Sequence, residues 1–256
     1  MRIAIVTGAS SGLGLEFARQ ITELYRNLNA LWVVARRTEK LEQLKEEIGG
    51  RCGMEVKIFD GDLSRDYIYE RIGKELDRNK ADIRMLVNCA GYGRMGRFFD
   101  IPEKEQLGMI DVNCRALTKM LLTCREHFSG GTRIVNVASA AAFAPSPGFA
   151  VYAAGKAYVK SLSHALSQEL RERGIYVTAV CPGPVETPFF DRAGSLPGRS
   201  GHVRRVDASA VVRKALRDAA KKRQTSVYGI SMKGARVLTK LVPDGVAAFV
   251  MRKINE

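Results

Sequence analysis

Short apolar runs alternate with longer amphipathic segments from the first residues of the chain onward. Most of the short runs are unbroken stretches of Val, Ile and Leu, the pattern typical of strands that are buried on both faces. Such strands belong to parallel sheets whose faces are covered by helices. The predicted strands are 2–6, 30–35, 54–60, 83–88, 133–139, 176–181 and 225–230.

The longer segments carry apolar residues at helical spacing, most clearly over 13–28, 38–48 and 208–223. This alternation predicts an α/β fold, a Rossmann-like, doubly wound parallel sheet of about seven strands with helices on both faces. The chain shows neither an internal repeat nor a low-complexity linker. We therefore expect residues 1–256 to form a single domain.

Two segments depart from this alternation. Residues 182–206 are rich in Gly and Pro, and because long loops inside compact domains are usually functional, we interpret this segment as a substrate lid. Residues 232–256 mix apolar and basic positions. This C-terminal extension could close the pocket as a helix, form an oligomer contact or lie on an anionic membrane surface. We favour pocket closure or an oligomer contact, and we rank membrane contact after them.

The composition bounds the class of protein. A chain of 256 residues, 46% of them hydrophobic, suffices for one large core, and no run of about 20 apolar residues predicts a membrane-spanning helix. The first predicted strand begins at residue 2, which leaves no room for a cleavable signal. The five cysteines are scattered, without a CxxC pair, as free thiols in a reducing compartment would be. We therefore expect a cytoplasmic protein without a metal site.

Positive charge gathers near the C-terminus. The net charge is +14, and residues 192–256 hold 15 Lys and Arg against 4 Asp and Glu. Such a segment could face nucleic acid, an anionic membrane or an acidic ligand, or could simply be solvated. Because it lacks interleaved aromatic residues and any nucleic-acid-binding motif, we expect no nucleic-acid partner.

A glycine-rich stretch, TGASSGLG (7–14), lies between the first predicted strand and the first predicted helix. Its glycines permit a tight turn that brings backbone N–H groups and a helix N-terminus against a pyrophosphate. With a strand before it and a helix after it, the motif predicts a dinucleotide site. The predicted cofactor-binding residues of this loop are Gly8, Ser10, Ser11, Gly12, Leu13 and Gly14.

The second strand is followed by Arg36 and Arg37, and no acid occurs until Glu39. An NAD site would place a carboxylate about twenty residues after the glycines, on the ribose 2′-hydroxyl. Two guanidinium groups suit a 2′-phosphate instead, because they can clamp it in bidentate fashion. We therefore predict NADP(H) in preference to NAD(H). The alternative is an arginine pair that merely faces solvent.

Tyr152 and Lys156, in the stretch AVYAAGKA (150–157), are four residues apart. Helical geometry puts them on one face, one turn apart. Such a pair is common in helices, where a core tyrosine beside a solvated lysine is the plainer interpretation.

Seven motifs together resemble the short-chain dehydrogenase/reductase family, over about residues 1–230. The glycine spacing is similar to that of the short, single-domain branch. One departure is Cys89, where the family usually has a second asparagine. The motifs are TGASSGLG, Asp62-Leu63, NCAG (88–91), Asn113, Ser139, YAAGK (152–156) and PGPVET (182–187).

This resemblance implies catalytic roles for four residues. Tyr152 would exchange a proton with the substrate oxygen, its pKa lowered from about 10 by Lys156 and by the positive nicotinamide ring. Lys156 would also reach the nicotinamide ribose. Ser139 would hydrogen-bond the substrate oxygen. Asn113 would interrupt helical bonding and hold a water on Lys156; a helix-interior Asn without consequence is the alternative.

The resemblance also implies the walls of the cofactor site. Asp62 would accept from the adenine amino group, and Leu63 would pack on the ring. The transferred hydride would be the pro-S one. The other wall residues are Asn88, Ala90 and Gly91 beside the adenine ribose, and Pro182, Gly183, Val185 and Thr187 along the nicotinamide.

Aromatic residues gather in the loops that follow the predicted strands, where doubly wound folds bind ligands. They favour an apolar ketone or secondary alcohol, such as a steroid, fatty-acyl or aryl compound, in a reversible NADP(H)-dependent oxidoreductase. A non-catalytic NADP(H)-binding sensor or scaffold is the alternative. Similar proteins are homodimers or homotetramers, with 105–128 and 149–173 as the expected contact. The predicted pocket residues are Tyr92, Phe143, Pro145, Phe149, Phe189 and Phe190.

Overall fold

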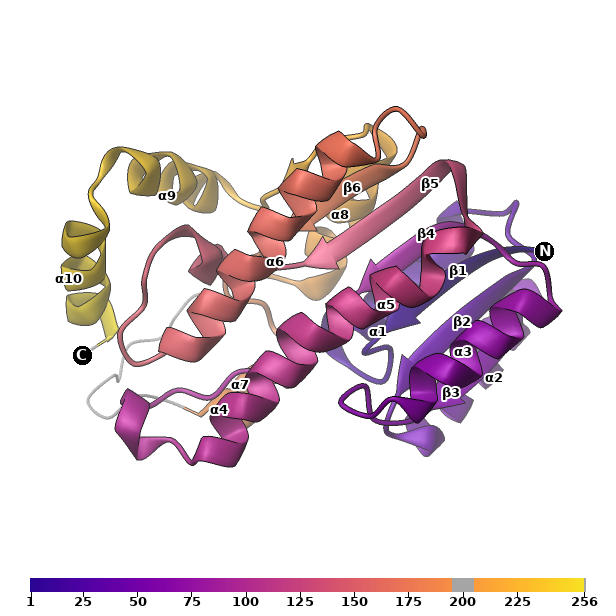
Figure 1. The fold of residues 1–256 in the computed structure, drawn as a ribbon, viewed down its shortest axis with the longest axis horizontal. Coiled ribbons are helices and arrows are strands. Elements are labelled where there is room, and N and C mark those ends of the chain that lie inside the picture. The colour runs from indigo at the N-terminus through magenta and orange to yellow at the C-terminus, as the bar shows by residue number, and fades with distance from the viewer. Residues whose placement is uncertain (195–204, 256) are drawn as a thin grey trace.

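A seven-stranded sheet, parallel throughout, forms the centre of the computed structural model, which describes residues 1–194 and 205–255 (Figure 1). Its strand order is β3-β2-β1-β4-β5-β6-β7, which confirms the predicted α/β, Rossmann-like architecture. The strands are β1 (Arg2–Thr7), β2 (Ala30–Ala35), β3 (Glu55–Asp60), β4 (Asp82–Asn88), β5 (Phe128–Val137), β6 (Tyr176–Val180) and β7 (Thr225–Ser226).

The strands bury both of their faces, which explains their unbroken apolar runs. Ile3 and Ile5 of β1 point into one core cluster, whereas Ala4 and Val6 point into the other. All six residues of β2 are buried. A strand with one solvated face would alternate apolar and polar residues. The unbroken apolar runs therefore indicate strands that are covered on both faces.

Helices pack on both faces of the sheet. The face of Ile3 and Ile5 packs against α3 (Tyr67–Arg78), α5 (Ala116–Cys124) and α6 (Ala150–Glu169). The opposite face packs against α1 (Gly12–Leu24), α2 (Thr38–Cys52) and α8 (Ala208–Ala220). The remaining elements are η1 (Phe98–Asp100), α4 (Glu103–Ile110), the π-helical turn η2 (Asp111–Arg115), η3 (Arg125–His127), η4 (Ala140–Phe143), α7 (Phe189–Ala193), α9 (Ile230–Leu241) and α10 (Asp244–Asn255).

The order of the strands reverses between β1 and β4. From β1 the chain proceeds to β2 and β3 on one side, and from β4 to β7 on the other. Loops leaving the carboxyl ends of β1 and β4 therefore run in opposite directions and leave a crevice between them. This topology places the glycine-rich stretch after β1 beside the residues that follow β4.

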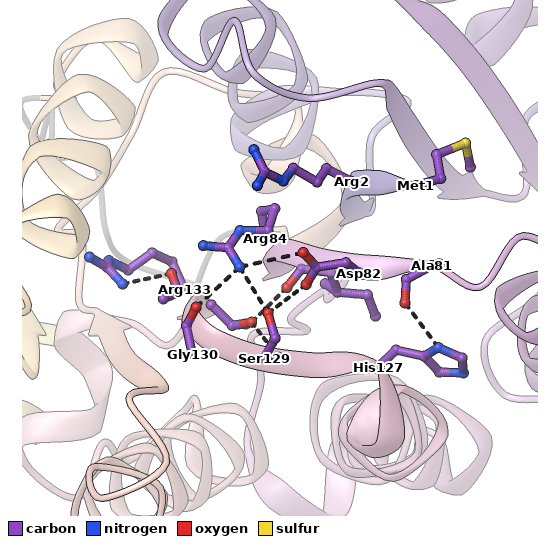
Figure 2. A network of polar contacts seen from close by, with 12 residues as sticks. Met1, Arg2, Ala81, Asp82, Arg84, His127, Ser129, Gly130 and Arg133 are labelled. Carbon is purple, nitrogen blue, oxygen red and sulfur yellow. Dashed lines mark hydrogen bonds and ion pairs between the residues drawn. The ribbon is translucent and has the colours of Figure 1, made fainter.

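The opposite end of the sheet is tied by a polar network (Figure 2). Asp82 accepts a hydrogen bond of 2.6 Å from the Ser129 hydroxyl, and Arg84 donates to the carbonyl of Gly130 at 3.1 Å. These contacts join the amino ends of β4 and β5. They extend β5 back to Phe128, five residues before the predicted start, and they lie away from the crevice.

Further differences from the sequence predictions lie toward the C-terminus. β7 ends at Ser226, because Gly229 turns the chain with φ of +86° and α9 begins at Ile230. The predicted lid contains α7 and a bridge between Val185 and Val206, while its residues 195–204 lie outside the described residues. The C-terminal extension forms two helices, broken where Val242 is extended before Pro243.

The described cysteines, which are all five in the chain, are free thiols.

Among residues 1–194 and 205–255, no helix combines the length and the apolar character needed to cross a bilayer.

Candidate active site

Tyr152 and Lys156 lie in the first two turns of α6, and both are buried, with 7% and 5% of their surface exposed. The Lys156 ammonium donates a 2.8 Å hydrogen bond to the carbonyl of Val137, at the end of β5. Its Nζ lies 5.7 Å from the centroid of the Tyr152 ring. The plainer interpretation of a solvated lysine is therefore wrong.

Burial dominates the titration of this pair. It raises the pKa of the Tyr152 phenol to about 12, although a hydrogen bond with Ser139 acts in the opposite direction. Burial likewise lowers the pKa of Lys156. In the protein alone, desolvation of the phenolate sets the direction of the Tyr152 pKa. The lowering of that pKa by Lys156 together with a positive nicotinamide ring concerns the protein with its cofactor bound and stays a prediction.

Ser139 follows the end of β5 at Val137 and lies beside Tyr152. It is the N-cap of η4, where its Oγ accepts a 3.1 Å hydrogen bond from the backbone N–H of Ala141. The hydroxyl keeps its own proton available while it accepts this bond. Ser139 thus shapes the turn after β5 and also contacts the phenol.

Asn113 sits in the π-helical turn η2, so the predicted interruption of helical bonding is present. Its side-chain amide accepts from the N–H of Tyr92 at 3.0 Å and donates to the carbonyl of Tyr92 at 2.8 Å. A Cβ at Gly91 would stand 2.8 Å from Asn113 Oδ1 and 3.3 Å from Lys156 Nζ. The alternative of an Asn without consequence is wrong, because this amide fixes the loop after β4. Its water-holding role stays a prediction.

The glycine-rich loop packs too closely for side chains. A Cβ at Gly8 would lie 2.9 Å from backbone atoms of Ala90, and one at Gly14 would lie 2.3 Å from the carbonyl oxygen of Gly8. Gly8 and Gly12 have φ of +71° and +55°, in the left-handed region that favours glycine. A Cβ at Gly12 would meet Thr187 at 3.2 Å. The loop after β1 therefore lies against both the β4 loop and the PGPVET segment.

The start of α1 suits an anion. Ser11, its N-cap, makes no side-chain cap bond to any described residue, and the first turn, GLGL, carries no acid. The Arg37 guanidinium donates to the Ser10 hydroxyl at 3.0 Å and to the Ser11 hydroxyl at 2.7 Å. Helix N–H groups without a capping side chain, next to a positive charge, are the donor set that a pyrophosphate needs.

Arg36 occupies a different position from Arg37. Its Nη1 lies 4.0 Å from Asp62 Oδ2, and its side chain is 61% exposed. Burial raises the pKa of Asp62, but hydrogen bonds from Ser64 and the charge of Arg36 together outweigh burial. The pKa is therefore lower than usual, and the carboxylate stays ionised. Leu63, next in the chain, is buried in the core cluster on the α3 face. Arg36 and Asp62 thus form an open, charged rim beyond the glycine-rich loop.

The residues after β4 rest on a buried polar chain. The Asn88 amide donates to Asn136 Oδ1 at 2.9 Å, and Asn136 donates to the Ser163 hydroxyl at 3.0 Å. The oxygen Oδ1 of Asn88 is buried without a hydrogen-bond partner among the described residues. Thr7 accepts from the N–H of Ala90 at 3.1 Å. Thr7 was not among the predicted site residues, although its place at the end of β1 is a signal for such a contact.

The PGPVET segment is held from two sides. The Pro182 carbonyl accepts a 2.8 Å hydrogen bond from Ala140 of η4. A Cβ at Gly183 would lie 2.9 Å from the sulfur of Met232 in α9. With Val185 in its bridge to Val206, this segment links η4, the glycine-rich loop and the C-terminal helices.

Some of the predicted pocket residues surround Tyr152 and others do not. Phe149 stacks on the Tyr152 ring at 4.2 Å between centroids, and Phe189 lies 5.4 Å from it. Tyr92 belongs to the same cluster, under the guanidinium of Arg192. The pocket residues outside this cluster are Phe143, which packs on the main core; Phe190, edge-on to Phe189; and Pro145, which is exposed.

Five further apolar residues of this cluster were not predicted, namely Met95, Met109, Val112, Ala141 and Val151. Met109 precedes Asn113 by four residues in the same continuous helical run, which places both on one face. That spacing was the available signal for Met109. Nothing in the local pattern distinguishes the other four.

The chain resembles known proteins in sequence and in structure. A family model described as short chain dehydrogenase matches residues 2–195. The 17-beta-hydroxysteroid dehydrogenase type 3 of Mus musculus is 32% identical over 192 residues, covering 73% of this chain and 61% of that protein. The very-long-chain 3-oxoacyl-CoA reductase of Anas platyrhynchos is 33% identical over 204 residues, covering 74% and 64%. The match thus spans under two thirds of these relatives.

Among solved structures, the chain resembles a short-chain dehydrogenase from Sphingobium yanoikuyae in complex with NADPH. The TM-score is 0.79 and the identity 28%, over 95% of this chain and 96% of that one. The similarity therefore extends through the whole sheet and its helices.

Proposed function

The chain belongs to the short-chain dehydrogenase family of oxidoreductases, and from this membership we propose that it is a single-domain, NADP(H)-dependent enzyme interconverting an apolar ketone and its secondary alcohol. The observation that carries the proposal is the buried contact of Tyr152 with Ser139, one helical turn from Lys156. A phenol held there can exchange a proton with a carbonyl oxygen.

The residues present fit a nicotinamide dinucleotide. The glycine-rich loop and the start of α1 would hold its pyrophosphate, and Arg36 with Arg37 would meet a 2′-phosphate. Asp62 would accept from the adenine amino group, Asn88 would lie beside the adenine ribose, and Thr187 would lie along the nicotinamide. The NADPH of the Sphingobium relative supports this cofactor. When bound, the cofactor supplies or accepts the hydride.

The side chains of this protein would manage the proton and the developing charge. With a pKa of about 12, the Tyr152 phenol stays protonated at neutral pH and can donate its proton to the substrate oxygen during reduction. The Ser139 hydroxyl would donate a second hydrogen bond to that oxygen. Lys156, held by Val137, keeps its ammonium one turn below the phenol. Alcohol oxidation needs the phenolate, so it is the direction that gains from raised pH.

The first prediction concerns that pKa. In the protein alone, Tyr152 should show no phenolate between about pH 6 and pH 9, because burial raises its pKa to about 12. The difference in ultraviolet absorption between wild type and Tyr152→Phe, recorded along a pH titration, measures this. Adding oxidised nucleotide brings a positive ring and should lower the midpoint. A phenolate already present near neutral pH without nucleotide would contradict the role of burial.

The substrate proposal rests on the aromatic cluster. Phe149 and Phe189 flank the Tyr152 ring, and the two relatives described above act, by their names, on a hydroxysteroid and a very-long-chain 3-oxoacyl-CoA, each of which has a large apolar part. An apolar pocket walled by this cluster would stabilise steroid, acyl or aryl ketones by burial of their surface. Small polar ketones would gain little there.

A second prediction tests this pocket through Phe189→Ala. We expect KM for a bulky apolar ketone to rise about tenfold, with a smaller change for a short-chain ketone, because the lost ring surface corresponds to about 1.5 kcal/mol of burial. Phe99→Ala is the matched control, since that ring is 95% exposed on η1. Equal effects on both ketones would contradict contact between Phe189 and the substrate.

Oxidation of NADPH in the presence of steroid, acyl and aryl ketones tests the function as a whole. We expect turnover with at least one of these classes, and about a thousandfold less from Tyr152→Phe. Binding of NADPH without turnover of any ketone would instead favour the sensor or scaffold.

We further propose a homodimer or homotetramer formed through α4, α5 and α6. Large apolar side chains are exposed on these helices, in keeping with the predicted contact over 105–128 and 149–173. A reducing, cytoplasmic location is proposed from the five free thiols. The exposed side chains are Leu107, Ile110, Leu122 and Tyr158.

A further inference from the structure

The two C-terminal helices expose an unusual amount of apolar surface. Seven large apolar side chains on α9 and α10 are between 48% and 88% exposed. Exposed large apolar side chains gathered on two successive helices mark a binding face more often than ordinary solvent contact. These residues are Ile230, Val237, Leu238, Leu241, Val246, Phe249 and Val250.

On α9 the exposed apolar side chains form one stripe that the fold does not use. At 100° per residue, Ile230, Val237, Leu238 and Leu241 fall within about a third of the helix circumference. The protein-facing side is a different one, marked by Met232, whose side chain packs against Gly183 and the main core. The helix therefore has two apolar sides, and packing among residues 1–194 and 205–255 explains only one.

On α10, the exposed apolar residues also share one side of the helix. Val246, Phe249 and Val250 stand at helical spacings of three and four, so they share a face, and Lys253 continues it at the C-terminal end. Buried Ala247 points elsewhere. Phe249 at the centre of this face is 61% exposed.

Charge identifies the occupant of these faces. Residues 230–255 contain five cations and one acid, Asp244. Lys233 and Lys240 lie two helical turns apart on α9, directly beside the apolar stripe. A second copy of this face would bring cations against cations, which is unfavourable, whereas an anionic lipid surface complements both the cations and the apolar stripe. The five cations are Lys233, Arg236, Lys240, Arg252 and Lys253.

We propose that α9 and α10 form a docking surface for membranes that contain anionic lipid. The apolar side chains enter the boundary between headgroups and acyl chains, while the flanking cations contact lipid phosphates and extend their stems along the apolar surface. Figure 1 shows both helices (yellow) beyond the end of the sheet toward which β5 points, which is the end that carries Tyr152. Resting on the proposed function, this position would present the active site to ketones dissolved in the bilayer.

Co-sedimentation of the full chain with vesicles tests the docking surface without any assay of turnover. We expect binding to phosphatidylcholine vesicles that contain phosphatidylglycerol, little binding to phosphatidylcholine alone, and weakening by salt. The double variant Leu238→Ser/Leu241→Ser should bind at least tenfold less. Leu24→Ser is the matched control, because Leu24 is 57% exposed and its helix, α1, covers the opposite face of the sheet from the one on which Met232 of α9 packs.

The charge component has its own pair of variants. Lys233→Gln/Lys240→Gln should weaken binding to the anionic vesicles about tenfold, whereas Lys40→Gln/Lys45→Gln on α2 should not. Absence of binding by the wild type, or equal binding by the C-terminal variants and their controls, would overturn the proposal. So would a fall in oligomeric mass of Leu238→Ser/Leu241→Ser by sedimentation, because the face would then hold a second copy. NADPH oxidation on a dissolved ketone, unchanged in these variants, separates this outcome from a failure of the proposed function.

Discussion

Replacing Tyr152 by Phe is expected to lower kcat for ketone reduction by about a thousandfold while the fold is retained. The substitution removes one hydroxyl and keeps the ring, which stacks on Phe149 with centroids 4.2 Å apart. Because the phenol is buried beside Ser139, no water can take its place as a proton donor without a cavity opening. The affinity for NADPH, measured by fluorescence titration, should change less than threefold, about the energy of one neutral hydrogen bond.

Tyr158→Phe is the matched control for this experiment. Tyr158 lies six residues later on the same helix, is 42% exposed, and its hydroxyl shares a 2.7 Å hydrogen bond with Thr118. Its removal should leave kcat unchanged. If Tyr152→Phe and Tyr158→Phe retain equal activity, with both variants folded by circular dichroism, Tyr152 is not the proton donor and the proposed mechanism fails.

The parts of the site that could be predicted from the sequence are those fixed by local backbone geometry. Gly8 and Gly12 stand where the chain needs positive φ, and such positions are visible as glycines between a strand and a helix. The carboxyl ends of β1 and β4 meet because the topology reverses there, and the alternation of strands and helices already implied that reversal.

The parts that could not be predicted depend on packing between distant segments. The pKa of Tyr152 follows from how completely α6, η4 and the residues near 149 and 189 enclose it, and no local pattern encodes that enclosure. Likewise, the amide of Asn113 is spent on the backbone of Tyr92, 21 residues earlier in the chain. The aromatic loop residues looked equivalent in sequence, yet Phe149 stacks on Tyr152 while Phe143 joins the main core.

The arginine pair shows a similar division. In sequence, Arg36 and Arg37 are interchangeable candidates for a 2′-phosphate. In the structure, Arg37 donates to the hydroxyls of Ser10 and Ser11 and so braces the glycine-rich loop. Arg36 extends beyond the loop, with Asp62 at 4.0 Å as its ion-pair partner. An exposed pair at this distance is weak, so Arg36 can exchange it for a phosphate at little cost.

This division predicts different outcomes for the two arginines. Arg36→Asp should lower the ratio of kcat/KM for NADPH to that for NADH by about 100-fold or more, because it removes a charge-assisted contact with the 2′-phosphate and adds a repelling carboxylate. Arg37→Ala should weaken both cofactors by similar factors, because it loosens the loop that holds their shared pyrophosphate.

Initial rates with both reduced cofactors, measured for each variant, give these ratios directly. Arg26→Asp, on the loop between α1 and β2, makes the same change of charge away from the crevice and should leave the ratio unchanged. An unaltered ratio in Arg36→Asp would contradict the assignment of Arg36 to the 2′-phosphate. A ratio that changes equally in Arg36→Asp and Arg26→Asp would trace the cofactor preference to the overall positive charge of the chain, +14, instead of to one guanidinium.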